Sequence, residues 1–139
     1  MKILVTTSTL KQDLDDPSPE FINNLIDGVA SISPDSEFIY VYPFKRTYPN
    51  LKSNKNISYK PYKYWITSKG HNILDKGLYQ SIKSNKLNFI KIFFLLLSQF
   101  FYTFYLTIKV KPDYIYAHWV FPQAFIASLI SKATKTRYV

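Results

Sequence analysis

The stretch KILVTT, residues 2–7, is a short apolar run that ends in threonines, and it opens the pattern that decides the fold class. A continuous apolar run without strict alternation is typical of a strand buried in a parallel sheet. Apolar side chains at helical spacing follow between Phe21 and Val29, and Glu37–Pro43 is a second apolar run. Strand, helix and strand within the first 43 residues indicate a βαβ unit. We therefore predict an α/β fold: a Rossmann-like parallel sheet with flanking helices.

The helix between these strands has a well-marked start. Ser18 is a suitable N-cap, Pro19 fits the first helical position, and Glu20 brings a negative charge into the first turn. The sequence thus predicts a helix from Ser18 to about Ser31.

The rest of the chain continues the α/β pattern after an irregular part. Residues 44–86 contain Pro49 and Pro61 and many Asn, Ser and Lys side chains. The expected later elements are a strand at 57–60, a loop or short helix through 72–83, an apolar helix at 87–108, a strand at 113–117, a helix at 123–132 and a strand opening at 136–139. A parallel strand must be covered by a further element of the chain. We therefore expect residues 1–139 to be one incomplete half of a larger two-domain protein, unable to complete a catalytic cycle alone.

The predicted helix at 87–108 is unusually apolar, with no charged residue in the 17 positions from Ile92 to Ile108. Its polar residues fall four positions apart or at multiples of four, and so form one stripe: Lys91, Gln99, Thr103, Thr107 and Lys111. The stripe favours a buried or membrane-apposed helix of a soluble fold. An interfacial amphipathic helix and a true membrane span remain open alternatives.

Composition excludes several classes of protein. With 47% hydrophobic residues the chain is too apolar for a disordered protein, and without cysteine it has no disulfide framework and no thiolate site. The apolar run at the N-terminus is too short for a signal peptide, so we expect a cytoplasmic protein. Residues 1–50 carry a net charge of −3 and residues 51–139 a net charge of +12. The basic part predicts an anionic partner: a lipid surface, a phosphate-bearing substrate or nucleic acid.

Among the side chains that could act in catalysis or bind a metal, only two are histidines and none is a cysteine. His118 follows a predicted parallel strand, and ligands of open α/β sheets bind beyond such strand ends. From position alone, a histidine that only caps the strand-to-helix turn is the favoured interpretation of His118, and a structural role is favoured more strongly for His71 in the irregular loop. Two histidines without cysteine do not predict a metal site. The chain has no Gly-rich phosphate loop and no dinucleotide fingerprint, so no cofactor is expected. The aromatic and basic segment 59–65 suits stacking on sugars or bases, or a membrane headgroup layer, unless it only reflects biased loop composition.

The segment DYIYAHWVFPQA, residues 113–124, resembles the motif around an Ala-His-Trp triplet followed by Pro-Gln in family 4 glycosyltransferases, which have the GT-B fold. Other features agree in order along the whole chain. The first strand opens at Met1, Pro19-Glu20-Phe21-Ile22 is similar to the start of the family's first helix, and Tyr62–Trp65 is similar to its aromatic–basic element. The apolar helix directly before the strand at 113–117 also matches.

The resemblance implies an N-terminal, acceptor-side domain, with 44–86 as an acceptor-side insertion. It implies a catalytic position for His118 near the donor sugar. The implied substrate contacts are Thr7, Ser8, Tyr64, Trp65 and Trp119. The implied donor is a nucleotide-sugar held mostly by a separate C-terminal domain, and the sugar is usually transferred with retention of configuration and without an obligatory metal. The implied acceptor is lipid-linked or a saccharide of the cell envelope, with peripheral contact at the inner face of the cell membrane.

The most important departure from the family pattern is that the C-terminal, donor-binding half is absent, and the sequence departs at two further points. Ala124 stands where the family usually has glycine, and the loop after the first strand lacks glycines that many members use. The lack of these glycines puts contacts between this half and the donor diphosphate in doubt. Two other functions compete: a non-enzymatic membrane-associated protein held by helix 87–108, and a nucleic-acid binder, which dispersed lysines and the lack of a recognised module disfavour.

Overall fold

The computed structural model describes residues 1–11, 20–45, 55–67, 71, 73–74 and 78–139. In this part of the chain a five-stranded sheet runs in the order β3-β2-β1-β4-β5, and every neighbouring pair is parallel. The strands are β1 (Lys2–Thr6), β2 (Glu37–Pro43), β3 (Ile57–Tyr62), β4 (Tyr114–Ala117) and β5 (Arg137–Tyr138). The predicted α/β class with a Rossmann-like parallel sheet is therefore confirmed.

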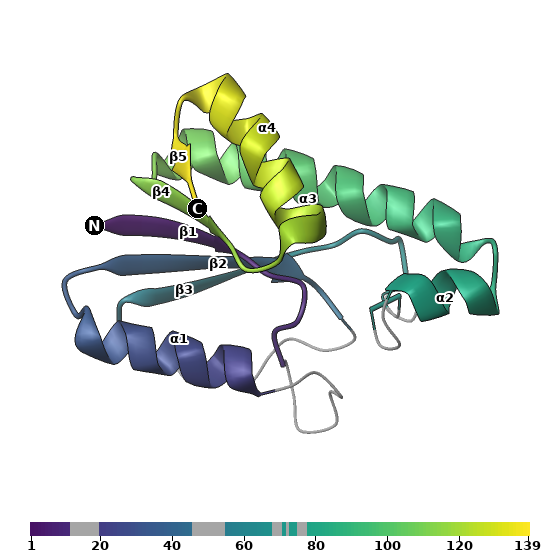
Figure 1. Cartoon of the computed structure of the whole chain (residues 1–139), viewed down its shortest axis with the longest axis horizontal. Helices are drawn as coiled ribbons and strands as arrows, with labels where there is room; N and C mark the ends of the chain where they lie inside the picture. The colour runs from purple at the N-terminus through teal and green to yellow at the C-terminus, as the bar shows by residue number, and fades with distance from the viewer. Residues whose placement is uncertain (12–19, 46–54, 68–70, 72, 75–77) are drawn as a thin grey trace.

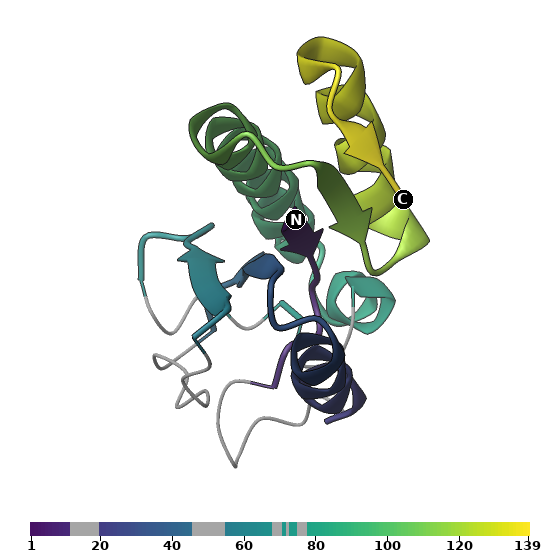
Figure 2. The same cartoon turned by 90° about the vertical axis from the view of Figure 1, so that its left-hand side faces the viewer.

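Helices cover both faces of the sheet, as Figures 1 and 2 show. Helix α1 (Phe21–Ile32) lies on one face, and α3 (Asn88–Val110) and α4 (Phe125–Thr134) lie on the other. The short helix α2 (Leu78–Ser84) precedes α3. Because successive strand residues point to opposite faces, Val5 and Tyr40 belong to the core under α1, while Leu4 and Ile39 belong to the core under α3 and α4.

Several element boundaries differ from those expected. The proposed N-cap Ser18 lies outside the described residues; α1 begins at Phe21, after Glu20, which makes no side-chain cap. The edge strand β3 runs on through Pro61 to Tyr62. Proline is tolerated there because an edge strand needs hydrogen bonds on one side only.

The helix expected from Gln123 is α4, which begins at Phe125 and follows directly on a π-helical turn, η2 (Val120–Ala124), that contains Gln123. Within η2, Phe121 alone has extended backbone angles (φ −129°, ψ 134°), so the helical path is kinked there. The peptide bond between Phe121 and Pro122 is cis. This turn separates β4 from α4 and exposes Trp119 between them.

Helix α3 has the predicted polar stripe, and the three uncharged members of the stripe face the protein interior. Gln99, Thr103 and Thr107 are 1%, 0% and 2% exposed. An amphipathic helix of a soluble fold usually turns its polar stripe to water. The opposite, exposed side of α3 is correspondingly rich in aromatic and aliphatic side chains.

Candidate functional site

The end of β4 lies at the topological switch point of the sheet. The chain passes from β1 to β2 on one side and reaches β4 on the other side of β1. Thr6 pairs with Ala117, so the next residues, Thr7 and His118, leave the sheet side by side. The His118 amide donates a hydrogen bond to the Thr6 carbonyl at 3.0 Å, and the Thr7 amide donates to the Val41 carbonyl at 3.1 Å. Ligands of open α/β sheets bind at this kind of crevice.

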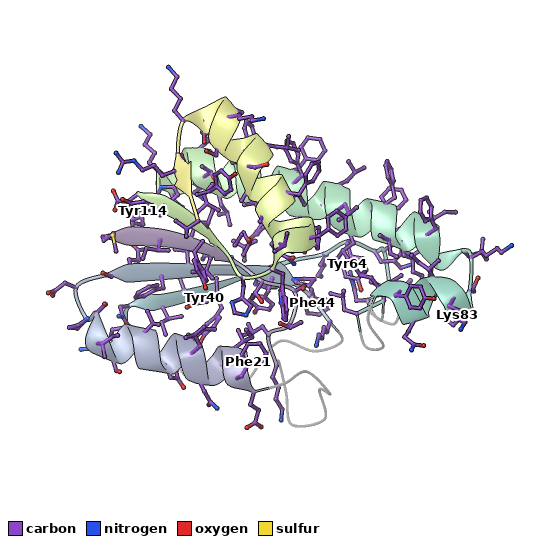
Figure 3. The ribbon with its side chains drawn as sticks, viewed as in Figure 1. Phe21, Tyr40, Phe44, Tyr64, Lys83 and Tyr114 are labelled. Carbon is purple, nitrogen blue, oxygen red and sulfur yellow. The ribbon has the colours of Figure 1, made fainter. Side chains whose placement is uncertain are left out.

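Three rings meet beside this crevice. The ring centroids of His118 and Trp119 are 5.4 Å apart, and Phe21, from the start of α1, lies 5.6 Å from His118 and 6.4 Å from Trp119. Figure 3 shows Phe21 at the beginning of α1. Trp119 is 41% exposed and Phe21 is 46% exposed, whereas His118 is partly buried between them. We call Phe21, His118 and Trp119 the aromatic shelf.

Hydrogen bonds fix the loop after β1 against this shelf. The Trp119 Nε1–H donates to Thr9 Oγ1 at 3.1 Å, and the Thr9 amide donates to Thr7 Oγ1 at 3.3 Å. Thr7 itself is buried, so its hydroxyl holds the loop from below. The loop thereby links β1 to the turn after β4 by side-chain contacts as well as by the sheet.

The same loop also anchors the start of α1. The Lys11 amide donates to Asn23 Oδ1 at 3.2 Å, and Asn23 Nδ2 donates back to the Lys11 carbonyl at 3.0 Å. Lys11 Nζ and Glu20 Oε1 form an ion pair at 2.6 Å, and this contact lowers the pKa of Glu20. These contacts explain why Phe21, the first residue of α1, lies against His118.

The electrostatic state of His118 follows from its burial, which lowers the pKa of its imidazole below the ordinary value of about 6.5. The neutral form of the ring therefore predominates at pH 7. In a neutral imidazole, one ring nitrogen can donate a hydrogen bond and the other can accept one. A neutral imidazole between two exposed rings can hold a hydroxyl group and can exchange a proton with it.

The predicted site residues fall into two groups. His118, Trp119, Thr7 and the adjacent Ser8 come together at the switch point, while Tyr64 and Trp65 follow β3. Because β2 and β1 separate β3 from β4, three strand spacings, or about 14 Å, divide the groups.

The second group is mostly packed against the protein. Tyr64 is 4% exposed, and its hydroxyl accepts a hydrogen bond from the Ile73 amide at 3.4 Å. The ring of buried His71 lies 4.6 Å from the Tyr64 ring, so the favoured interpretation of His71 as a structural residue fits its packing. Trp65 packs edge-on against Phe94 of α3 at 5.9 Å, and the Lys91 ammonium lies 5.5 Å from its ring. The position of Tyr64 near α3 can be followed in Figure 3.

Sequence reasoning missed Phe21 and Thr9, because only the folded chain brings them to Trp119. It also missed Gln123, which follows β4 and is fully buried with neither amide atom hydrogen-bonded to any described residue. The buried Thr6 Oγ1 at the end of β1 likewise has no partner in the described part of the chain. The available signals were a polar residue at the end of the first predicted strand for Thr6 and the Pro122-Gln123 pair of the family-like segment for Gln123.

Among the described residues, no three His, Cys, Asp or Glu side chains come together where they could hold a metal ion. Comparisons with protein-family models, with curated proteins and with solved structures found no match for this chain.

Proposed function

We propose that this chain is the acceptor-side domain of a sugar-nucleotide-dependent glycosyltransferase of the GT-B type, acting in cell-envelope or polysaccharide biosynthesis. The single observation that carries the proposal is the aromatic shelf of Phe21, His118 and Trp119 at the switch point of a Rossmann-like sheet. The resemblance of residues 113–124 to the family 4 motif supports it.

The shelf suits a carbohydrate ligand for physical reasons. Exposed aromatic faces bury the apolar C–H face of a sugar ring, and a neutral imidazole between them offers one donor and one acceptor to its hydroxyl groups. The proposed acceptor lies along the carboxyl edge, bordered by Thr7 and Ser8. Trp65, about 14 Å away across the sheet, would contact a more distant part of a long acceptor.

The proposed reaction transfers a hexosyl group. A bond forms between an acceptor hydroxyl oxygen and the anomeric carbon of the donor, while the bond from that carbon to the diphosphate oxygen breaks. The nucleoside diphosphate leaves with the electron pair and receives the hydroxyl proton. In this proposal a second domain holds the nucleotide-sugar, and His118 positions the reacting sugar from the acceptor side.

A binding experiment tests the proposal directly. In a Trp65→Phe background, Trp119 is the single tryptophan of the chain and reports on the shelf by its fluorescence. Neutral and acetamido trisaccharides, free and linked to a polyprenyl diphosphate, are titrated into the protein. Nucleotide-sugars are titrated in the same way for comparison. We expect saturable quenching by a saccharide and none by a nucleotide-sugar. His118→Phe keeps a ring but removes a hydrogen bond, and should weaken binding about tenfold.

Ile32→Ala is the matched control, because Ile32 lies at the far end of α1 from Phe21 and is exposed. Saturable binding of a nucleotide-sugar with no response to any saccharide would assign the shelf to a nucleotide instead. The absence of any fluorescence change with every saccharide would also overturn the proposal.

A second candidate function is a membrane-associated protein without catalysis. The observation that favours it is α3: its 23 residues are long and apolar enough to cross a membrane, although 28% of its most apolar window is buried within the protein. Extraction of membranes with alkaline carbonate distinguishes the two kinds of attachment. Release of the chain into the soluble fraction would exclude a membrane-spanning α3, and resistance to extraction would support one.

A further inference from the structure

Helix α3 carries an exposed apolar surface along almost its whole length. Its exposed large side chains include Ile90, Phe93, Phe94, Phe101, Tyr105 and Ile108. We call these six residues the outer face of α3. Phe101, near the middle of the 23-residue helix, has 62% of its surface exposed, so the apolar surface is not confined to the helix ends.

These side chains form one continuous strip. Ile90, Phe94, Phe101 and Ile108 are separated by four, seven and seven positions, which places them on one side of a helix with 3.6 residues per turn. From Ile90 to Ile108 the strip is about 27 Å long at 1.5 Å per residue. Contiguous apolar surface of such extent is rare on a monomer and marks an interaction surface.

Positive charge surrounds the strip. Lys83 and Lys86 are exposed just before α3, Lys109 and Lys111 are exposed at its end, and Lys63 is exposed after the neighbouring β3. Figure 3 shows Lys83 on α2, beside the start of α3. Between residues 78 and 139, all of which the structure describes, Asp113 is the only acidic residue. Its carboxylate accepts a hydrogen bond from the Lys2 amide at 2.7 Å, beyond the end of α3.

Aromatic and basic side chains also line two hollows beside the strip. One, of about 310 Å³, is bordered by Lys63, Trp65 and Phe94, and the other, of about 360 Å³, by Lys63, Tyr102 and Tyr105 among others. Lys109 Nζ donates to the Tyr105 hydroxyl at 3.1 Å, so an ammonium group is held at the rim. Amphipathic rings next to lysines are typical of the headgroup level of a bilayer.

We propose that the outer face of α3 is a membrane-docking surface that lies flat on an anionic bilayer. Phe94 and Phe101 would enter the boundary between headgroups and acyl chains, and the lysines at both helix ends would contact anionic headgroups. The buried side of α3, with Gln99 and Thr103, stays packed in the protein, so the helix lies on the membrane and does not cross it. The inference rests on α3 and is independent of the proposed sugar site.

The charge pattern selects a lipid surface over a second copy of the chain. In an antiparallel pair of α3 helices, Lys83 and Lys86 of one copy would approach Lys109 and Lys111 of the other. Like charges so placed oppose association. An anionic bilayer, by contrast, offers negative charge directly above an apolar layer, which is the complement of this surface.

Vesicle sedimentation with the full chain tests the proposal. We expect binding to phosphatidylcholine vesicles containing phosphatidylglycerol, and far less binding to phosphatidylcholine alone. High salt should weaken binding, because the screening length falls from about 10 Å at 0.1 M to about 3 Å at 1 M. The double variant Phe94→Ser, Phe101→Ser and the double variant Lys86→Gln, Lys109→Gln should each reduce partitioning about tenfold or more.

Matched controls lie elsewhere on the surface. Ile32→Ser removes a side chain that is 80% exposed on α1, on the opposite face of the sheet, and Lys55→Gln removes an exposed charge before β3. Both should bind vesicles like the unchanged chain. All substitutions are at exposed positions, and circular dichroism is the check that each variant is folded.

Three outcomes would overturn the inference. They are binding that the α3 variants do not weaken, resistance of the chain to carbonate extraction, and a dimer in solution that Phe94→Ser, Phe101→Ser dissociates. The second would make α3 a span, and the third would make the outer face an interface between copies.

Discussion

Helices α1 and α3 pack against opposite faces of one sheet, but α3 buries polar side chains together with apolar ones, whereas α1 buries apolar ones. Helix α1 buries Ile22, Ile26 and Ala30 at a spacing of four. Helix α3 repeats the spacing of four with polar residues, Gln99, Thr103 and Thr107. It buries them beside Ile92, Leu95 and Leu106, and it leaves Phe93, Phe94 and Phe101 exposed. A periodic pattern therefore locates two sides of a helix but does not tell which side is inside.

The difference has an energetic meaning. Burial of an aliphatic side chain contributes about 1.5–3 kcal/mol, so α1 is held by its buried side. Burial of a hydroxyl without a partner costs about 1–3 kcal/mol, and Thr103 Oγ1 has no hydrogen-bond partner in the described part of the chain. Helix α3 thus gives up part of its folding stability and keeps several large apolar side chains exposed, which fits a role for them outside this domain.

The largest expected effect contrasts one apolar residue from each helix. Ile26→Ala should lower the free energy of unfolding by about 2–4 kcal/mol, because it opens a cavity between α1 and the sheet. Phe101→Ala removes a larger side chain but should change stability by no more than about 0.5 kcal/mol, because Phe101 is mostly exposed. Urea denaturation measures both. Similar losses in the two variants would refute the reversed orientation of α3.

A smaller effect is expected within the buried stripe. Thr103→Val replaces an unpartnered hydroxyl by a methyl group of the same shape and should raise stability by about 1 kcal/mol. Thr107→Val is the matched variant, because Thr107 Oγ1 donates to the Thr103 carbonyl at 2.8 Å. Loss of this hydrogen bond should lower the free energy of unfolding by about 1 kcal/mol. The midpoints of thermal unfolding should therefore move in opposite directions, and a shift of both in the same direction would contradict the assignment.

These residues also show how far sequence reasoning reaches. The βαβ unit and the strand at 37–43 were predictable, because a buried parallel strand needs a continuous apolar run and the helix between the strands needs its own period. The position of His118 after a strand was predictable for the same reason. Its neighbours Phe21 and Thr9 were not, because their contacts join residues about a hundred positions apart.

The orientation of α3 lay beyond the sequence for a different reason. The stripe of Gln99, Thr103 and Thr107 can be seen in the sequence, but a polar stripe on an amphipathic helix usually faces water. Its burial depends on how α3 and α4 meet above the sheet, which is a property of tertiary packing. Similarly, Tyr64 stood out as an aromatic residue for substrate contact, and only the folded chain encloses it between Ile73 and His71.

The α3 side of the sheet should also respond to pH through His71. Burial, together with the positive charges of Lys63 and Lys91, lowers the pKa of His71 in the folded state. The unfolded chain, with a pKa of about 6.5, then binds the proton more tightly. Stability should thus be constant with respect to this group above pH 6.5 and fall as pH decreases below it. In His71→Phe, urea midpoints should fall less steeply between pH 7 and pH 5 than in the unchanged chain; equal slopes would show that His71 does not titrate differently on folding.

The smallest effect concerns the one exposed aromatic side chain of α1 that has partners. Phe21 covers His118, and burial lowers the pKa of that imidazole. A protonated imidazole quenches a neighbouring indole, so in a Trp65→Phe background the emission of Trp119 should fall on acidification, with a midpoint below about 6.5. Phe21→Ala admits water to His118 and should move that midpoint upward, because desolvation is the cause of the lowered pKa. Leu25→Ala, one turn further along α1, is the control and should leave it unchanged. If the midpoint is the same in Phe21→Ala, then Phe21 does not cover His118. Helices α1 and α3 would then differ only in the side chains that they bury.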